Sequence, residues 1–281
     1  MEKPSWLSKK LNLNSCHEMK KFLRVLKLHT VCEESLCPNI SECFGEGVAT
    51  FMILGDNCTR NCKFCAVGKK KPSMVDWNEP RRIREAVAKL NLSYVVITSP
   101  TRDDISDGGA EFFCRTIDEI KNIGTSVKVE ILIPDFLGNA EALAVIAKSK
   151  ADVIGHNLET IPSLYPAIRP QADYERSLSV LKTIKQMNGN IFTKSGIMLG
   201  LGEEEKQITD VFRDLRKVDC DFLTLGQYLP PSLSHYPVKE YITPDRFVSL
   251  QKAAYSLGFK KVNSSPYVRS SYLASQFLKS A

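Results

Sequence analysis

Three closely spaced cysteines are the residues of this sequence whose type and spacing most clearly indicate chemistry. Cys58, Cys62 and Cys65 form the pattern C-x3-C-x2-C, so one loop can bring three thiolates to a single metal centre. Iron–sulfur clusters are held by thiolates of this kind, whereas structural zinc takes four protein ligands, commonly in C-x2-C pairs. Three ligands leave one iron of a [4Fe–4S] cluster without a protein ligand. The spacing therefore favours a cluster with an open iron, with zinc as the alternative.

A second cysteine triad precedes the first. Cys32, Cys37 and Cys43 form the pattern C-x4-C-x5-C, which predicts a second cluster. A zinc site and redox-active thiols are the alternatives for this triad. The remaining three cysteines, Cys16, Cys114 and Cys220, show no ligand spacing. Cys114 and Cys220 fall within or near the ends of predicted helices. We expect these two to pack as small apolar residues.

An open iron can bind a small molecule that carries its own donor groups. The amino and carboxylate groups of S-adenosylmethionine form such a chelate, and an electron can then enter the sulfonium. Phe64 lies directly before the last cysteine of the later triad. With this aromatic residue, the motif resembles that of the radical S-adenosylmethionine superfamily.

Short apolar segments alternate with amphipathic ones along the chain, which predicts alternating strands and helices. The expected strands are 48–54, 94–98, 127–133, 152–157, 191–199 and 221–225. The expected helices are 81–90, 109–123, 140–149, 174–187 and 204–218, and a last one begins at Pro244 with Thr243 as its cap.

Six strand–helix units in succession imply a parallel sheet with right-handed crossovers. Six units are too few for a complete eight-fold barrel, so a partial, curved barrel and an open doubly wound sheet both fit the pattern. The polar segments after the strands, GDNCTRNCKFC among them, would share the functional face at the strands' carboxyl ends.

The two triads together resemble the paired signature of the lipoyl synthase family. Further matching segments are KPSWL, TSPTRDDISDGGA, ILIPDF, HNLETIPSLYPAIRP, TKSGIMLGLGE, LGQYLPPS and RSSYLA. The resemblance runs from about residue 3 to residue 274, and biotin synthase and other relatives share only the later triad. It implies an α/β fold, a partial (β/α)6 TIM-like barrel. We expect that barrel over 48–260, an N-terminal extension with auxiliary-cluster ligands over 1–47, and a C-terminal tail with RSSY over 261–281.

The resemblance also implies the roles of the cysteines. The later triad would hold the [4Fe–4S] cluster that binds and cleaves S-adenosylmethionine. The earlier triad would hold an auxiliary [4Fe–4S] cluster that donates sulfur, with a serine of RSSY as its fourth ligand. Alignment of that motif points to Ser271 rather than Ser270.

Further residues, Phe64 among them, are implied as contacts of S-adenosylmethionine. Asn157 and Glu159 stand two residues apart at a strand end, on one side of the strand, and would bond the ribose hydroxyls. Gly200 belongs to a glycine-containing stretch against which the adenine would lie, since glycine permits close backbone approach. Arg102, Asp103 and Asp104 could contact the methionine moiety or the lysine region of the substrate, and an internal ion pair fits them equally well.

The family resemblance implies the activity and its partners. The enzyme would insert two sulfur atoms at C6 and C8 of a protein-bound octanoyl-lysine. Its substrates would be octanoylated lipoyl domains of 2-oxoacid dehydrogenase complexes or the glycine cleavage H protein. Flavodoxin or ferredoxin would donate electrons.

Composition limits the remaining possibilities. The chain has 281 residues, 43% of them hydrophobic, and a net charge of +6 without a long basic run, so we expect no nucleic-acid partner. Its N-terminus lacks the apolar stretch of a secretory signal, and no segment resembles a membrane span. We therefore expect a cytoplasmic protein whose nine cysteines serve metal binding or catalysis rather than disulfides.

Two rival functions use the same cysteines. A different radical enzyme, such as a methylthiotransferase or a biotin synthase relative, would also carry an auxiliary cluster, but the earlier triad and RSSY argue against it. A non-catalytic electron-transfer or zinc-binding module would not need six strand–helix units.

Overall fold

The computed structural model describes residues 2–9, 13–124 and 126–278, which form two compact units. The N-terminal unit consists of Lys9–Arg60 and Ala66–Ile154. The C-terminal unit consists of Met1–Ser8, Asn61–Cys65 and Gly155–Ala281. The division passes through the cysteine loop at 58–65, so Cys58 belongs to the first unit and the two later cysteines to the second.

The N-terminal unit is built on strands in sequential order. They are β1 (His29–Thr30), β2 (Thr50–Met52), β3 (Tyr94–Thr98), β4 (Lys128–Leu132) and the first two residues of β5 (Val153–Gly155). β1 runs antiparallel to β2, and β2, β3 and β4 are parallel, with Phe51 opposite Ile97 and Ile97 opposite Ile131. These three side chains are fully buried, so the register places the apolar residues of neighbouring strands side by side.

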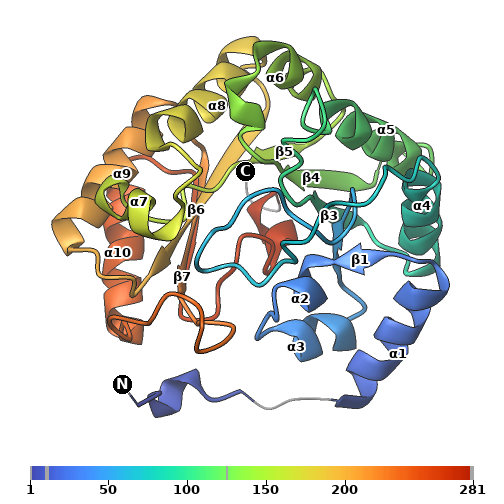
Figure 1. Cartoon of the computed structure of the whole chain (residues 1–281). Coiled ribbons are helices and arrows are strands. Elements are labelled where there is room, and N and C mark those ends of the chain that lie inside the picture. The colour runs from blue at the N-terminus through green and yellow to red at the C-terminus, as the bar shows by residue number, and fades with distance from the viewer. Residues whose placement is uncertain (1, 10–12, 125, 279–281) are drawn as a thin grey trace. The chain divides into compact units, whose positions relative to one another are not determined.

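Helices follow β2, β3 and β4 in turn. They are α4 (Glu79–Lys89), α5 (Ala110–Lys121) and α6 (Ala140–Ala147), which form a row outside the strands (Figure 1). Asn139 caps α6 by accepting hydrogen bonds from the backbone N–H groups of Glu141 and Ala142. Such a cap satisfies donors that the first turn of a helix leaves unpaired.

The cysteine-rich start of the chain is helical, which the sequence patterns did not predict. It forms α1 (Leu13–Val25), α2 (Val31–Glu34) and α3 (Ile40–Gly45). Thr30 caps α2 by accepting a hydrogen bond from the Glu33 N–H at 3.3 Å. The earlier cysteine triad therefore lies on short helices and their connection.

The C-terminal unit repeats the strand–helix alternation. Its parallel strands are β6 (Phe192–Leu199), β7 (Phe222–Gln227) and β8 (Lys261–Ser264), in that order. Its helices are α7 (Tyr165–Ile168), α8 (Tyr174–Met187), α9 (Glu205–Lys217) and α10 (Pro244–Ser256), and α8, α9 and α10 lie outside β6 and β7 (Figure 1). The Thr243 side chain caps α10 as predicted, accepting from the Arg246 N–H.

The core of the C-terminal unit lies between these helices and the strands. Ile208, Phe212 and Leu215 on α9 are completely buried against Leu223 and Leu225 of β7. Cys220 is also fully buried in this core, which confirms its predicted packing role. Cys114 is only partly buried on α5.

The predicted alternation is confirmed along the chain. The units are β2–α4, β3–α5, β4–α6, β5–α8, β6–α9 and β7–α10. β8 was not predicted. Short 3-10 turns complete the described structure: η1 (Ser5–Leu7), η2 (Phe136–Gly138), η3 (Pro162–Leu164) and η4 (Ala274–Phe277). Over the described residues, none of the helices has both the length and the apolar character needed to cross a bilayer.

Candidate functional site

Cys58 is held in the loop that follows β2. Its N–H donates to the Gly68 carbonyl oxygen at 2.7 Å, within a bridge that pairs Asn57 with Gly68. Its sulfur accepts backbone N–H groups of Thr101 at 3.3 Å and Arg60 at 3.4 Å. Hydrogen bonds to a thiolate stabilise its charged form, and these two also fix the position of the Cys58 sulfur.

The later half of the same loop is fixed inside the C-terminal unit. Lys63, between Cys62 and Cys65, donates its N–H to the Ile168 carbonyl oxygen at 2.8 Å. The Lys63 carbonyl oxygen accepts from the Tyr236 N–H at 2.9 Å. Backbone bonds on both sides of Lys63 hold the two cysteines in a defined conformation.

Phe64 anchors this half of the loop by packing. Its ring lies partly buried against a cluster formed by Ile168, Leu201 and Tyr228, all within the C-terminal unit. The aromatic residue that the motif singled out therefore has a clear packing role. Its predicted contact with a cofactor remains a prediction.

The earlier triad lies within the N-terminal unit, with Cys32 on α2 and Cys43 on α3. The Cys37 N–H donates to the Cys32 carbonyl oxygen at 3.1 Å, which closes the connection between the helices. Burial, followed by the charge of Cys37, raises the pKa of the Cys32 thiol to about 12 and that of Cys43 to about 11. A raised pKa favours the neutral thiol, so Cys32 and Cys43 would give up their protons on binding a cationic centre such as a metal cluster.

The spacing of these sulfur atoms bears on the choice between zinc and a cluster. Thiolates around one tetrahedral zinc lie roughly 4 Å apart, given Zn–S bonds near 2.3 Å. Among the described residues, the group of three possible ligands whose atoms all lie within 4.8 Å of one another is His29, Glu34 and Asp56, not the earlier cysteine triad. The three sulfur atoms of the earlier triad do not all lie within that 4.8 Å limit.

Asn157 and Glu159 meet beyond the end of β5, as the sequence predicts. The Asn157 side-chain amide donates to Glu159 Oε1 at 3.1 Å and to the hydroxyl of Ser270 at 2.6 Å. Burial raises the pKa of the Glu159 carboxyl, while the positive charge of Arg169 lowers it. Glu159 has a left-handed backbone (φ 66°), a conformation that is strained for this residue type and is found at functional sites.

One polar atom of this group still lacks a partner. Asn157 Oδ1 is buried, and it accepts no hydrogen bond from the described part of the chain. A Cβ at Gly196 would lie 3.0 Å from this oxygen, 3.0 Å from the Ser270 hydroxyl and 2.6 Å from that of Thr224. The glycine in β6 therefore makes room for a polar group, which fits a ligand with hydroxyl donors.

Gly200 has a different neighbour from the one expected. Its φ is +94°, and a Cβ there would collide with the Glu240 carbonyl oxygen and the Gln227 side chain. The buried Gln227 amide donates to the carbonyl oxygens of Leu199 at 3.1 Å and Glu240 at 3.0 Å. The groups that approach Gly200 closely are therefore the Glu240 carbonyl oxygen and the Gln227 side chain. A contact between Gly200 and adenine remains a prediction.

The C-terminal tail lies along the strand ends of its own unit. The Pro266 carbonyl oxygen accepts from the Gln227 N–H at 3.1 Å. The Tyr267 hydroxyl donates to the Leu7 carbonyl oxygen at 2.5 Å and so ties the tail to the start of the chain. Tyr267 was not identified from the sequence, because its partner is 260 residues away and no spacing rule connects them.

Arg102 and Asp104 form the internal ion pair that was one of two expectations. The Arg102 guanidinium donates to both Asp104 oxygens at 2.8 Å. It also donates to the carbonyl oxygens of Leu54 at 2.9 Å and Ser73 at 3.0 Å. With only 3% of its surface exposed, Arg102 is a structural support of the loop after β2.

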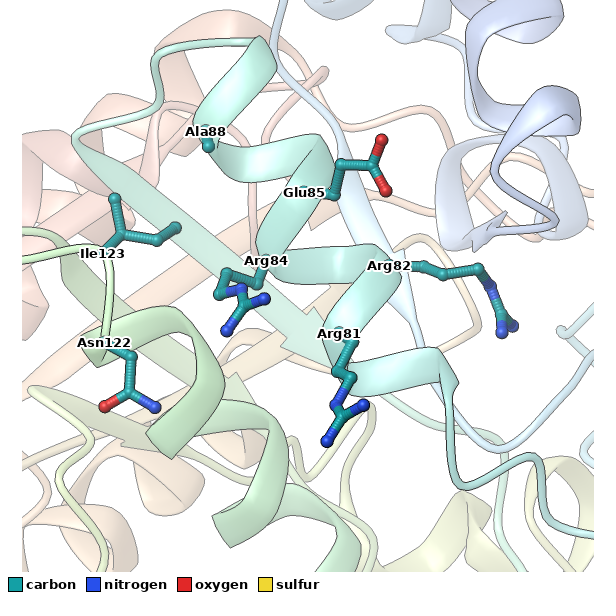
Figure 2. A pocket seen from close by; sticks show the side chains of 7 residues that line it. All are labelled: Arg81, Arg82, Arg84, Glu85, Ala88, Asn122 and Ile123. Carbon is teal, nitrogen blue, oxygen red and sulfur yellow. The ribbon is translucent and has the colours of Figure 1, made fainter.

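A separate hollow of about 520 Å³ lies on the outer side of α4, beside the end of α5 (Figure 2). Arg81 and Arg84 line it, and both pair with Glu119, at 3.8 and 2.9 Å. None of the predicted site residues lines this hollow.

Similarity to known proteins extends over nearly the whole chain. The Radical SAM superfamily profile matches residues 52–215. A lipoyl synthase of Caldicellulosiruptor saccharolyticus is 56% identical over 99% of this chain and 98% of that protein. A lipoyl synthase of Aquifex aeolicus is 52% identical over 96% of this chain and 98% of that protein.

Solved structures support the fold. A methylornithine synthase matches 94% of this chain and 85% of its own at a TM-score of 0.59 and 15% identity. A maturase of the [FeFe]-hydrogenase matches 90% of this chain and 68% of its own chain, with a TM-score of 0.59 and 13% sequence identity. The predicted α/β partial barrel is confirmed, and at 50–56% identity to lipoyl synthases over nearly its full length the chain belongs to the lipoyl synthase family of the radical S-adenosylmethionine superfamily.

Proposed function

We propose that this protein inserts two sulfur atoms, at C6 and C8, into an octanoyl chain carried on a lysine of a protein substrate. The observation that carries the proposal is the pair of cysteine triads in a chain that is 56% identical to a lipoyl synthase over 99% of its length. Family membership implies two [4Fe–4S] clusters and S-adenosylmethionine as cofactors.

We assign Cys58, Cys62 and Cys65 to the cluster that binds S-adenosylmethionine. The N–H groups directed at the Cys58 sulfur support this assignment, since they stabilise a thiolate ligand. Bound there, the cluster supplies the electron that splits the sulfonium. The protein's own part is to orient the cofactor and exclude water from the reactive centre.

We assign the earlier triad, Cys32, Cys37 and Cys43, to the auxiliary cluster that donates sulfur, with Ser271 as its fourth ligand. The Ser270 hydroxyl already accepts a 2.6 Å hydrogen bond from Asn157. Its neighbour Ser271 is therefore the better candidate for a ligand. A hydroxyl oxygen is a weak ligand for such iron, which suits a cluster that must release sulfide.

We assign the ribose hydroxyls of S-adenosylmethionine to Asn157 and Glu159. The unpartnered Asn157 oxygen and the partly buried Glu159 carboxylate offer acceptors at the end of β5. Phe64 would cover the loop near the cofactor, and Gly200 would lie near the adenine.

The substrates follow from the reaction. They are octanoylated carrier proteins, for which we propose lipoyl domains of 2-oxoacid dehydrogenase complexes or the glycine cleavage H protein. A flavodoxin or ferredoxin would deliver the electrons. We propose the cytosol as the compartment, since cysteines at metal-ligand spacing are typical of proteins from a reducing compartment.

An anaerobic assay tests the proposal. The reconstituted protein is incubated with S-adenosylmethionine, dithionite and an octanoyl-lysine peptide, and 5′-deoxyadenosine and dithiolated peptide are measured. Cys58→Ala is expected to abolish deoxyadenosine, whereas Cys37→Ala is expected to retain deoxyadenosine and lose sulfur insertion. Equal loss of both products in both variants would contradict the assignment of the two cysteine triads to different clusters. Methylthiolated products would instead favour a methylthiotransferase.

A further inference from the structure

Arg60 lies in the cysteine loop, two residues after Cys58, and is bound by two carboxylates. Its Nε and Nη2 donate to Asp103 at 2.8 and 3.0 Å. Its Nη1 and Nη2 donate to Asp135 at 2.9 and 2.6 Å. Only 5% of Arg60 and 1% of Asp135 are exposed, so four charge-assisted bonds fix this guanidinium away from bulk water.

The two carboxylates come from the carboxyl ends of neighbouring strands in the N-terminal unit. Asp103 follows β3, and Asp135 follows β4, where its side chain also accepts from the Leu137 N–H at 3.1 Å. Thr59 adds to the connection by accepting from the Asp103 N–H at 3.1 Å. The segment directly after Cys58 is thereby fastened to two strand ends.

This arrangement fixes the backbone N–H groups that donate to the Cys58 sulfur. One donor to this sulfur is the backbone N–H of Arg60, whose side chain the two carboxylates hold. The second donor is the N–H of Thr101, two residues before Asp103. A shift of the Arg60 side chain would therefore move the donors that face the sulfur. Buried ion pairs add little net stability, because desolvation offsets their attraction. Stability alone therefore does not account for the group of Arg60, Asp103 and Asp135.

We propose that Arg60, Asp103 and Asp135 are positioning residues for the S-adenosylmethionine cluster, which fix the Cys58 sulfur and hold the reduction potential of that cluster low. This inference rests on the proposed function. Two carboxylates against one guanidinium leave one net negative charge beside the ligand loop. Negative charge in a poorly solvated site disfavours the added electron of the reduced cluster. A low potential makes that electron a strong enough reductant to cleave a sulfonium.

The potential is measured by EPR-monitored redox titration of the reconstituted enzyme, on the signal that changes when S-adenosylmethionine is added. Asp103→Asn and Asp135→Asn remove one negative charge with little change of shape, and each is expected to shift the midpoint to a more positive value. Asp152→Asn is the matched control, because Asp152 pairs with Lys121 and Lys128 at the opposite end of β4. The control is expected to leave the midpoint unchanged.

A second measurement needs no cluster. In the apo protein, Arg60→Lys keeps the charge and loses the forked geometry. The N–H donors at the Cys58 sulfur then shift and stabilise its thiolate less, so Cys58 should become alkylated severalfold more slowly, while Cys37 keeps its rate. Unchanged midpoints in both Asp→Asn variants, or an unchanged Cys58 rate in Arg60→Lys, would overturn the inference. If S-adenosylmethionine leaves the EPR signal of the unmodified enzyme unchanged, the proposed function itself fails, so the two failures are distinguishable.

Discussion

The Asn157 side chain donates a 2.6 Å hydrogen bond to the hydroxyl of Ser270, 113 residues later in the chain. This bond joins the residue that follows β5 to the tail that carries RSSY. The same asparagine also donates to Glu159. A predicted cofactor-binding pair and the tail are thus parts of one polar group within the C-terminal unit.

Ser270→Ala is expected to loosen the tail. The change leaves a buried Asn157 donor without its partner, at a cost of about 1–3 kcal/mol. Amide hydrogen exchange over residues 265–278 should become faster in this variant. The comparison is made in the protein without clusters, where Ser271→Ala is the matched control because it keeps the bond from Asn157 to Ser270. Equal exchange in the two variants would contradict a specific role for Ser270.

Asn157→Ala is expected to weaken binding of S-adenosylmethionine about tenfold, because loss of one well-placed hydrogen bond costs about 1.4 kcal/mol. Equilibrium binding to the reconstituted enzyme measures the Kd. Asn122→Ala, an exposed asparagine at the end of α5 (Figure 2), serves as the control. A Kd that does not change in Asn157→Ala would contradict a hydrogen bond between Asn157 and S-adenosylmethionine.

The two assigned clusters predict the metal content. Anaerobically reconstituted protein should contain about eight irons and about eight labile sulfides per chain, and Cys37→Ala about four of each. Chelation of the iron should also lower the thermal stability of the N-terminal unit, because the bonds from the assigned cluster to Cys32, Cys37 and Cys43 are then lost. One or two zinc ions without sulfide would contradict the cluster assignment.

Regular elements with strong patterns were predictable from sequence. The predicted limits of α8 (Tyr174–Met187) and β3 (Tyr94–Thr98) coincide with the observed ones, because α8 has helical apolar periodicity and β3 is a bounded run of β-branched residues. The short helix α2 has only four residues and depends on the Thr30 cap and on packing. Its sequence is too short to show a helical period.

The cysteines and Asn157 were found from sequence because their spacing is local. Arg60 was not, since its acidic partners lie 43 and 75 residues away and are brought together only by neighbouring parallel strands. Ser270 was passed over in favour of Ser271 for the same reason. Contacts that depend on strand order leave no local signal in the chain.

Glu79 at the start of α4 predicts a pH dependence of stability. It is 4% exposed, and burial raises the pKa of its carboxyl to about 7, although the hydrogen bond from the Leu54 N–H acts in the opposite direction. The carboxyl is protonated in both the folded and unfolded states at low pH. Between the usual carboxyl pKa of 4.5 and about 7, the unfolded state releases this proton and the folded state keeps it, so stability on the order of 3 kcal/mol has been lost when the pH reaches about 7.

Glu79→Gln removes this titration and keeps an oxygen that can accept the Leu54 N–H. The Tm of the variant relative to the unmodified protein should therefore increase between about pH 6 and about pH 8. Differential scanning calorimetry under anaerobic conditions measures this difference. Glu85→Gln, at an exposed position on the same helix, is the control and should show no such increase. If the Glu79→Gln difference is the same at both pH values, the buried carboxyl is not the group that couples stability to pH.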